Sequence, residues 1–423
     1  MNTVHTSQPL TANQKRGFIA AWAGWALDGM DSFIYALVMV PALRELLPRS
    51  GIPATTANIG FYGGLLFALF LVGWGLSMLW GPIGDRFGRV RTLSLTILCY
   101  SVFTLAGAFA TSVWHLALFR LLAGIGVGGE WTLGSTFIAE EWPEDKRKRG
   151  AGYMQTGYYL GILFAGLLNA TIGAAYGWRA MFLFGGTPAL LVFWIRRGVH
   201  EPERWKPAAS ALQSLAALFT PEYRRRTLVN CGFLLVSITG LWAGSVYVPT
   251  AVNFLAAKDG LSVADAARRA SLATVLLSSG TILGAIFVPV WADRWGRRRI
   301  QAALFSLMFV AITMTFGVAF YLESHALGWF LALLFFLGLG GANFTTYMFW
   351  LPEQYRTECR ASALGFISSV GRFAGAGITL LVGWGVSQTG TIGLPVALTS
   401  VAFLFGLALL PFGLETTGQE LPD

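Results

Sequence analysis

A duplicated loop between long apolar segments is the feature that most constrains the fold of this chain. The first copy reads GPIGDRFGRVR (Gly81 to Arg91) and the second reads VPVWADRWGRRR (Val288 to Arg299). Each copy follows one long apolar run and opens another. A second repeated pattern, Pro-Glu-x-x-Arg, occurs at 143–147 and at 352–356. The chain is therefore predicted to be a tandem duplication of one membrane-embedded half, which is a common construction in secondary transporters.

The apolar runs predict an all-α integral membrane protein. Only 12% of the 423 residues are charged, whereas a soluble domain carries about a quarter. A bilayer core about 30 Å thick needs about 20 apolar residues per helix. We count twelve candidate spans, at approximately 17–41, 58–80, 93–111, 114–139, 151–173, 178–195, 227–255, 271–291, 301–321, 328–350, 361–384 and 393–411. They predict two six-helix pseudo-symmetric bundles, at 1–195 and 227–423, with a cytoplasmic linker at 196–226.

The positions of the positive charges predict the orientation of the spans. The net charge is +9, and most of the 30 lysines and arginines lie near the N-terminus or in alternate connections at 81–92, 140–150, 196–226, 292–300 and 351–360. The positive-inside rule places these connections and both termini in the cytoplasm, for a multi-pass protein of the cytoplasmic (inner) membrane. Because the basic balance follows this topology, we expect no nucleic-acid partner. The first run contains Asp28 and Asp31 and has no cleavage site after it, so it is predicted to be a span rather than a signal peptide.

The sequence favours neither an enzyme nor an ATP-driven pump. None of the five lysines stands in the G-x-x-x-x-G-K-[ST] pattern that cradles phosphates. The glycine-rich run GIGVGGEW (Gly124 to Trp131) lies inside an apolar helix, where Gly124 and Gly128 form a face for close helix packing. The three cysteines are far apart and form neither a disulfide framework nor a metal site. We therefore expect no catalytic residue, no cofactor and no bound metal.

Five charges are predicted to lie inside the bilayer, where each is costly unless it is paired or hydrated. Asp28 and Asp31 are three residues apart and share one face of the first span. Two carboxylates this close disfavour each other's ionisation, which suits proton loading and release near neutral pH. Asp28, Asp31 and Glu130 are the predicted proton-coupling residues, with a structural hydrogen-bonding role as the alternative. Arg120 and Glu130 are predicted either to have different partners or to pair through water.

Arg372 stands in ISSVGRFAGAG with no acidic residue in its own helix. A bidentate carboxylate is the best geometric match for a guanidinium group. Both an acidic side chain of another helix and an anionic substrate meet this need. Polar and aromatic residues of other spans are candidates to complete a substrate cavity, with ordinary helix packing as the alternative for each. The candidate substrate-binding set is Arg372, Arg120, Gln155, Tyr158, Asn169, Trp242, Tyr247, Asn343 and Tyr347.

The duplicated loops, together with RLLAGIGVGGEW and EEWPEDKRKRG, resemble the major facilitator superfamily over essentially the whole chain. Two stretches are similar to the sialate and monocarboxylate (lactate, pyruvate) proton symporters and, in second place, to the aromatic-acid proton symporters. They are AAWAGWALDGMDSFIYALV and YGWRAMFLFGGTPALLVFWIRRGVHEPERW. Both groups carry a D-G-x-D pattern in the first span, matched by Asp28, Gly29 and Asp31. The arginine matched by Arg372 is more typical of the aromatic-acid group, and LETTGQELP is similar to the sugar and organic-ion porters.

The paired loops are also predicted to form a conformational latch. Their glycines allow a tight turn, Asp85 can cap the following helix or face a neighbouring helix N-terminus, and the arginines can pair with Glu140 or Glu141. The resemblance to the superfamily implies that such contacts hold the outward-open state. The predicted latch comprises Gly81, Asp85, Arg86, Gly88, Arg89, Glu140, Glu141, Asp293, Arg294, Gly296 and Arg297.

The sequence thus predicts a monomeric secondary active transporter that performs proton-coupled symport of a small organic anion by alternating access. Its expected partners are this anion, protons and the lipid bilayer. One alternative is a superfamily transporter of a sugar or zwitterion, in which Arg372 is only structural. Another is a non-transporting membrane sensor, although the longest loop is too short for the added output domain usual in such sensors.

Overall fold

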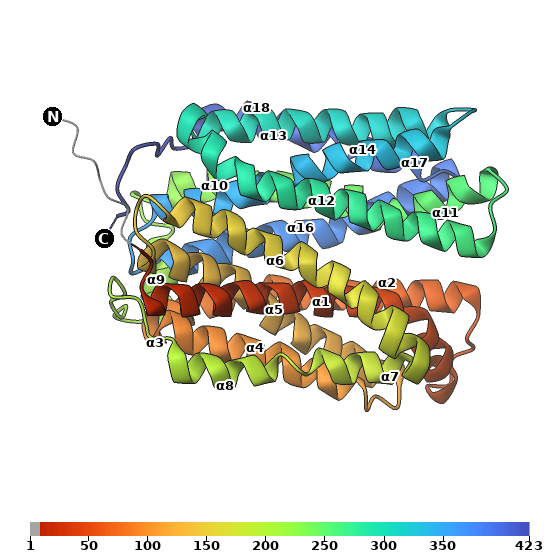
Figure 1. The fold of residues 1–423 in the computed structure, drawn as a ribbon, viewed down its shortest axis with the longest axis horizontal. Coiled ribbons are helices and arrows are strands. Elements are labelled where there is room, and N and C mark those ends of the chain that lie inside the picture. Colours follow the sequence, from red (N-terminus) through yellow and green to blue (C-terminus); the bar gives the residue numbers. More distant parts are fainter. Residues whose placement is uncertain (1–8, 423) are drawn as a thin grey trace.

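The computed structural model describes residues 9–422; the side chains of Trp242 and of a few other helical residues lie outside this description. Over the described range the chain is helical and contains no strand. A lipid environment offers no water to satisfy backbone groups, so each span closes its hydrogen bonds internally as a helix. The all-α membrane prediction is confirmed. The two halves of the chain form two bundles that lie side by side (Figure 1).

The N-terminal bundle begins with a helix that Thr11 caps, through the backbone N–H of Gln14. A 3₁₀ turn at Ser77–Leu79 joins α2 to α3, and a π-helix at Asn169–Gly173 extends α6. The chain reverses at Gly177, whose φ of 79° is accessible to glycine without steric cost. The helices are α1 (Ala12–Arg49), α2 (Thr56–Leu76), α3 (Trp80–Phe87), α4 (Arg89–Gly107), α5 (Val113–Glu141), α6 (Arg147–Leu168), α7 (Ala174–Gly185) and α8 (Ala189–Gly198).

The C-terminal bundle follows a connection that contains the short helix α9 (Ala211–Ala217). The turn between α12 and α13 repeats the turn between α3 and α4, with Gly296 in the place of Gly88 and a positive φ at both. The helices are α10 (Arg224–Val246), α11 (Val248–Lys258), α12 (Val263–Trp295), α13 (Arg297–Ile312), α14 (Ala326–Gly341), α15 (Asn343–Trp350), α16 (Arg360–Thr389), α17 (Gly393–Leu398) and α18 (Val401–Leu409).

Ten described helical segments are long and apolar enough to cross a membrane. One of them, Arg147–Val192, contains the predicted span 151–173 and most of the predicted span 178–195, because the chain turns back at Gly177 without a long break. The predicted span 227–255 is divided between α10 and α11 at Tyr247. The predicted twelve-helix, two-bundle fold therefore agrees with the structure.

The two bundles meet mainly through α2, α3 and α6 of the first half and α12, α15 and α16 of the second. Several glycines allow the helices to pack closely at this interface and in the cores of the bundles. A Cβ added at Gly81 would lie 2.4 Å from the Ala361 carbonyl oxygen of α16, and one at Gly152 would lie 2.4 Å from that of Ala285 on α12. Within the first half, a Cβ at Gly124 would lie 2.2 Å from the Phe70 carbonyl oxygen, which confirms its packing role.

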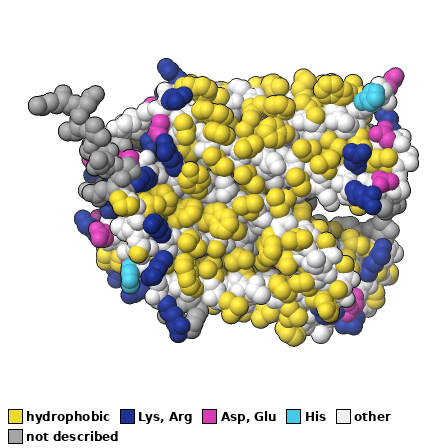
Figure 2. All heavy atoms as spheres, viewed as in Figure 1, with side chains coloured by type: hydrophobic (Ala, Val, Ile, Leu, Met, Phe, Trp, Pro, Cys, Tyr) yellow, Lys and Arg dark blue, Asp and Glu magenta, His cyan; other side chains and the backbone are white. Residues whose placement is uncertain are grey.

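Lysine and arginine side chains gather at one end of the molecule, where both ends of the described chain also lie (Figures 1 and 2). We call this the basic end. Apolar side chains dominate the surface between the ends (Figure 2). At the end opposite the termini, a notch separates the two halves in this view, whereas backbone contacts at Gly81 and Gly152 join them nearer the basic end. The halves are therefore packed together near the basic end, and on this face a notch lies between them at the other end.

Candidate functional site

Four charged side chains lie in the core of the N-terminal bundle. Asp28 and Asp31 belong to α1, Arg120 and Glu130 belong to α5, and all four are fully buried. Glycines in α1 allow this arrangement. A Cβ at Gly24 would lie 2.2 Å from the Glu130 Oε2 atom, so α1 passes directly over that carboxylate. The sequence correctly predicted that these four charged residues are buried, and the structure adds which of them pair with each other.

Arg120 and Asp31 form one buried unit. The Arg120 Nη2 atom lies 3.8 Å from Asp31 Oδ1 and donates a hydrogen bond to Thr104 at 3.0 Å. The guanidinium carbon lies 5.6, 5.7 and 5.1 Å from the ring centroids of Tyr35, Phe70 and Phe182, which are cation–π distances. Arg120 therefore has an acidic partner other than Glu130, as one of the two sequence-based alternatives predicted.

Asp28 and Glu130 are less completely paired. Glu130 Oε1 accepts a hydrogen bond from Thr96 at 2.8 Å. Its Oε2 atom and both carboxylate oxygens of Asp28 have no hydrogen-bond partner among residues 9–422. The charges that act on Asp28 are those of Glu130, Asp31 and Arg372. Asp28 is thus influenced electrostatically by two other carboxylates of its own bundle and by one arginine of the other bundle.

Arg372 on α16 reaches across the interface between the bundles. Its side chain is 7% exposed, and its guanidinium carbon lies 4.5 Å from the ring centroid of Trp74 on α2. The carboxylate of Asp28 acts on it electrostatically. Its Nη1 atom has no hydrogen-bond partner within the described chain. The site therefore combines a cation of one half with an acidic cluster of the other half.

The other predicted substrate residues fall into two groups. Gln155 on α6 and Asn343 on α15 are buried and each has a side-chain oxygen without a hydrogen-bond partner in the described part. The Tyr158 ring packs against Trp25, with centroids 4.7 Å apart. These three belong to helices at or beside the interface between the bundles.

The remaining predicted residues have other contacts or lie outside the description. The Tyr347 hydroxyl is buried between Ser237 and Gln301, at 2.8 Å from each. The Tyr247 hydroxyl donates to the Thr379 carbonyl oxygen at 3.2 Å. Asn169 lies at the start of the π-helix, with its side-chain oxygen against Gly173. The side chain of Trp242 is among those not described.

The predicted latch residues meet residues of both bundles at the basic end. Asp85 accepts hydrogen bonds from the backbone N–H groups of Ala361 (3.1 Å) and Ser362 (2.8 Å) at the start of α16. It also pairs with Arg89 at 2.8 Å. Of the two roles expected for Asp85, the structure thus shows the contact with a neighbouring helix N-terminus, where the helix dipole favours a negative charge.

A reciprocal arrangement of charges links the bundles around this contact. In the first half, Glu140 pairs with Arg89 and with Arg360 of the second half, at 2.8 Å each. In the second half, Glu353 pairs with Arg297 at 2.8 Å and with Arg147 of the first half at 3.5 Å. Each half therefore contributes one glutamate that binds an arginine of its own half and an arginine of the other.

This symmetry corrects the register of the second repeated motif. The sequence aligned Glu144 with Glu353, but the residue that performs the role of Glu353 is Glu140. The short Pro-Glu-x-x-Arg match misled the alignment by four positions. Arg147 corresponds to Arg360 and not to Arg356, and neither Arg360 nor Glu353 was predicted as a latch residue. A search for Glu and Arg seven apart in both halves would have found them.

The other predicted latch residues differ in what they contact: a loop, a helix of their own bundle or a helix of the opposite bundle. Arg86 donates to the Ala208 carbonyl oxygen at 2.6 Å, and Glu141 accepts from Asn13 at 2.8 Å. Asp293 pairs with Lys148 of the first half and lies 3.6 Å from Arg297. The guanidinium group of Arg294 forms no ion pair with any described residue.

Comparison with known proteins identifies the family. The profile of the Major Facilitator Superfamily matches residues 21–378. The chain belongs to this superfamily. It is therefore a membrane transporter and not an enzyme, as predicted.

Several relatives of this transporter are named as transporters of organic acids. A probable 4-methylmuconolactone transporter of Cupriavidus pinatubonensis is 31% identical over 435 residues, which cover 97% of this chain and 92% of that protein. A sialic acid transporter of Escherichia coli is 25% identical and covers 96% of this chain and 95% of its own. The structure of a proton:xylose symporter superposes with a TM-score of 0.79 at 18% identity, over 97% and 98% of the two chains, and supports the fold alone.

Proposed function

We propose that this transporter couples the movement of a small organic anion to the movement of protons in the same direction. The observation that carries the proposal is Arg372, a buried cation at the interface whose Nη1 atom has no hydrogen-bond partner in the described chain. Leaving a guanidinium group incompletely satisfied in low dielectric is costly. A substrate carboxylate offers the planar, bidentate acceptor that matches it best. The relative named as a sialic acid transporter supports this class of substrate.

The coupling follows from the position of Asp28. Its charge acts on Arg372, while the charges of Glu130 and Asp31 act on it. An ionised Asp28 competes with the substrate anion for the same cation. Once Asp28 binds a proton, Arg372 is available to the anion. Proton binding and anion binding therefore strengthen each other, as reciprocal linkage requires, and both ligands move together.

We assign the other two carboxylates to the same process. Glu130 has one free oxygen and is a second site at which a proton can be held. Asp31 is the carboxylate that Arg120 neutralises, so its protonation would release Arg120. Gln155 and Asn343, from two helices that pack across the interface, supply unused polar atoms for the rest of the substrate.

The basic end is proposed to face the cytoplasm. It carries the excess of lysine and arginine that the positive-inside rule assigns to that side. The charge pairs at this end join the bundles, so the site of Arg372 would open to the opposite side in this conformation. We infer that these pairs are the latch of the outward-open state, and that they must break when the transporter opens to the cytoplasm.

The Asp85→Asn variant is expected to turn over at least tenfold more slowly than the parent, a change of roughly 1.4 kcal/mol. The substitution removes the negative charge from the start of α16 and from Arg89, so it destabilises one access state. Binding of the anion to the state that remains accessible should change little. Uptake rates and binding affinities in proteoliposomes measure the two effects separately.

Asp293→Asn is the matched control, because Asp293 occupies the equivalent position in the second half but is 48% exposed. Its variant should keep turnover within about fivefold of the parent, since exposed ion pairs contribute roughly 1 kcal/mol or less. Parental turnover in a folded Asp85→Asn protein would contradict the latch.

The substrate class is tested by thermal unfolding of the purified protein with a panel of organic acids and their amides. A ligand that binds only the folded state raises the melting temperature. At a ligand concentration of a hundred times its Kd, the free energy of unfolding increases by about 2.7 kcal/mol. We expect carboxylates to stabilise the protein and the corresponding neutral amides to have no effect. Equal stabilisation by acid and amide, or by sugars alone, would reject the anion assignment.

A further inference from the structure

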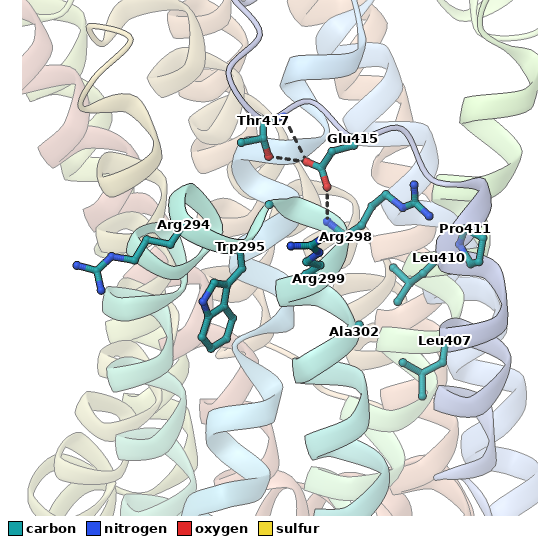
Figure 3. A pocket seen from close by; sticks show the side chains of 11 residues that line it. Arg294, Trp295, Arg298, Arg299, Ala302, Leu407, Leu410, Pro411, Glu415 and Thr417 are labelled. Atoms are coloured by element: carbon teal, nitrogen blue, oxygen red, sulfur yellow. Dashed lines mark hydrogen bonds between the residues drawn. The ribbon is translucent and has the colours of Figure 1, made fainter.

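A second polar cavity, remote from Arg372, opens at the basic end between α13, the end of α18 and the C-terminal tail. It has a volume of about 630 Å³. Arg298 and Arg299 lie between Trp295 on one side and apolar residues of α18 and the following turn on the other (Figure 3). Its lining comprises Arg294, Trp295, Gly296, Arg298, Arg299, Ala302, Leu407, Leu410, Pro411, Glu415 and Thr417.

The positive charge of this cavity is not neutralised by its one acid. Glu415 accepts the backbone N–H groups of Arg297 at 3.0 Å and Arg298 at 3.1 Å, and the hydroxyl group of Thr417 at 2.6 Å (Figure 3). Burial opposes ionisation of this carboxyl, but these hydrogen bonds outweigh it and hold its pKa below the ordinary value. Its oxygens are thus used by backbone and hydroxyl donors.

The three arginine side chains remain available. Among the described residues, the guanidinium groups of Arg294, Arg298 and Arg299 form no ion pair and no hydrogen bond. The nearest acid in sequence, Asp293, is already paired with Lys148 and Arg297. The cavity therefore presents three positively charged guanidinium groups that can donate hydrogen bonds, and its one carboxylate already accepts hydrogen bonds from the protein.

The equivalent cavity of the first half lacks this charge. It has a volume of about 440 Å³ and contains Arg91, His200 and Glu201. Glu201 accepts the backbone N–H groups at the start of α4 as Glu415 does at α13. Val90 stands where the second half has Arg298. Arg86, the counterpart of Arg294, is bound to Ala208. The duplicated halves have thus diverged toward positive charge at one of the two positions.

Beyond the cavity, α13 and α18 carry exposed apolar side chains. Phe405 on α18 is 69% exposed and Val310 on α13 is 50% exposed, as expected for lipid-facing residues. Trp295 is 52% exposed at the cavity rim, and tryptophan is enriched at the membrane–water interface. A ligand that fills this site therefore needs an anionic head and apolar chains that continue along the helices.

We propose that this cavity binds the headgroup of an anionic phospholipid. Its phosphate would lie against Arg298 and Arg299, with Arg294 at the rim, and its acyl chains would follow the outer faces of α13 and α18. Basic pockets between helices on the cytoplasmic side are suited to such headgroups. A soluble phosphate would use the arginines but not the exposed apolar side chains of α13 and α18, which is why the lipid is the occupant we propose.

The test compares thermal unfolding of the full-length protein in detergent with added phosphatidylglycerol, phosphatidylcholine or inorganic phosphate. Phosphatidylglycerol should raise the melting temperature of the parent by several degrees more than phosphatidylcholine, and inorganic phosphate should give no shift. The double variant Arg298→Ala/Arg299→Ala should lose the difference between the two lipids. Arg91→Ala, in the equivalent cavity of the first half, should keep it.

Three results would overturn the proposal. They are an undiminished lipid difference in the double variant, equal effects of the two lipids on the parent, and a shift of the same size with inorganic phosphate. If the double variant does not fold, the single variant Arg299→Ala replaces it, because that side chain is exposed. Native mass spectrometry of co-purified phosphatidylglycerol then gives the same comparison, with at least a tenfold lower lipid occupancy expected than in Arg91→Ala.

Discussion

Replacing Arg372 by lysine is expected to weaken binding of the organic anion by about 1–3 kcal/mol, the scale of a charge-assisted hydrogen bond. This corresponds to a roughly 5- to 150-fold rise in Kd. Lysine keeps the positive charge but loses the planar fork that a carboxylate accepts. Arg372→Ala should bind still more weakly, because it removes the cation that reaches the interface over Trp74. Isothermal titration with the best acid of the thermal panel measures both variants.

Arg268 provides the control for Arg372. It belongs to the C-terminal half, but its side chain is 81% exposed and only 3.5 Å from Asp265 in a surface pair. Arg268→Ala should bind the anion as the parent does. If Arg372→Ala also binds with parental affinity, the arginine is a structural partner of Asp28, and the organic-anion assignment rests on the relatives alone.

The Asp28→Asn variant should lose uphill uptake of the anion altogether while it retains exchange of internal for external substrate. Exchange requires no net proton movement, so it survives the loss of a proton site. Because the variant also removes the charge that competes for Arg372, its affinity for the anion should no longer fall as pH rises. In the parent, affinity for the anion should fall as pH rises, because Asp28 then loses its proton. Glu130→Gln is expected to show reduced uphill uptake by the same reasoning.

Glu323→Gln is the control for the carboxylate variants, since Glu323 is exposed in a loop far in sequence from the site. It should couple normally. Unchanged uphill uptake in Asp28→Asn, Asp31→Asn and Glu130→Gln together would remove all three proposed proton sites.

The sequence predicted what depends on local pattern and on the cost of charge in lipid. The duplicated loops revealed the two bundles, and the rarity of charge in apolar runs singled out Asp28, Asp31, Arg120, Glu130 and Arg372. All five prove to be buried. The apposition of Asp85 and a helix N-terminus, and the pairing of Arg89 with Glu140, also followed from residue chemistry.

What the sequence did not predict are contacts between residues far apart in the chain. Arg360 meets Glu140 across 220 positions and Glu415 caps α13 across 118. Neither pairing leaves a local signature. Tyr347 resembled a cavity residue because it is a polar aromatic in an apolar run, yet its hydroxyl is held by Ser237 and Gln301 on neighbouring helices. Which buried carboxylate lies near Arg120 and which lies near Arg372 depends on how each helix is rotated about its axis. Amino-acid composition does not determine this rotation.

Uptake driven by a pH gradient tests the central claim most directly. Proteoliposomes containing the parent protein, with the pH lower outside, should accumulate the acid above its external concentration, alkalise the external medium as they do so, and leave the neutral amide outside. Dissipating the gradient with a protonophore should reduce the accumulated acid to equilibrium. Accumulation that is indifferent to the gradient, or equal transport of acid and amide, would contradict proton-coupled anion symport.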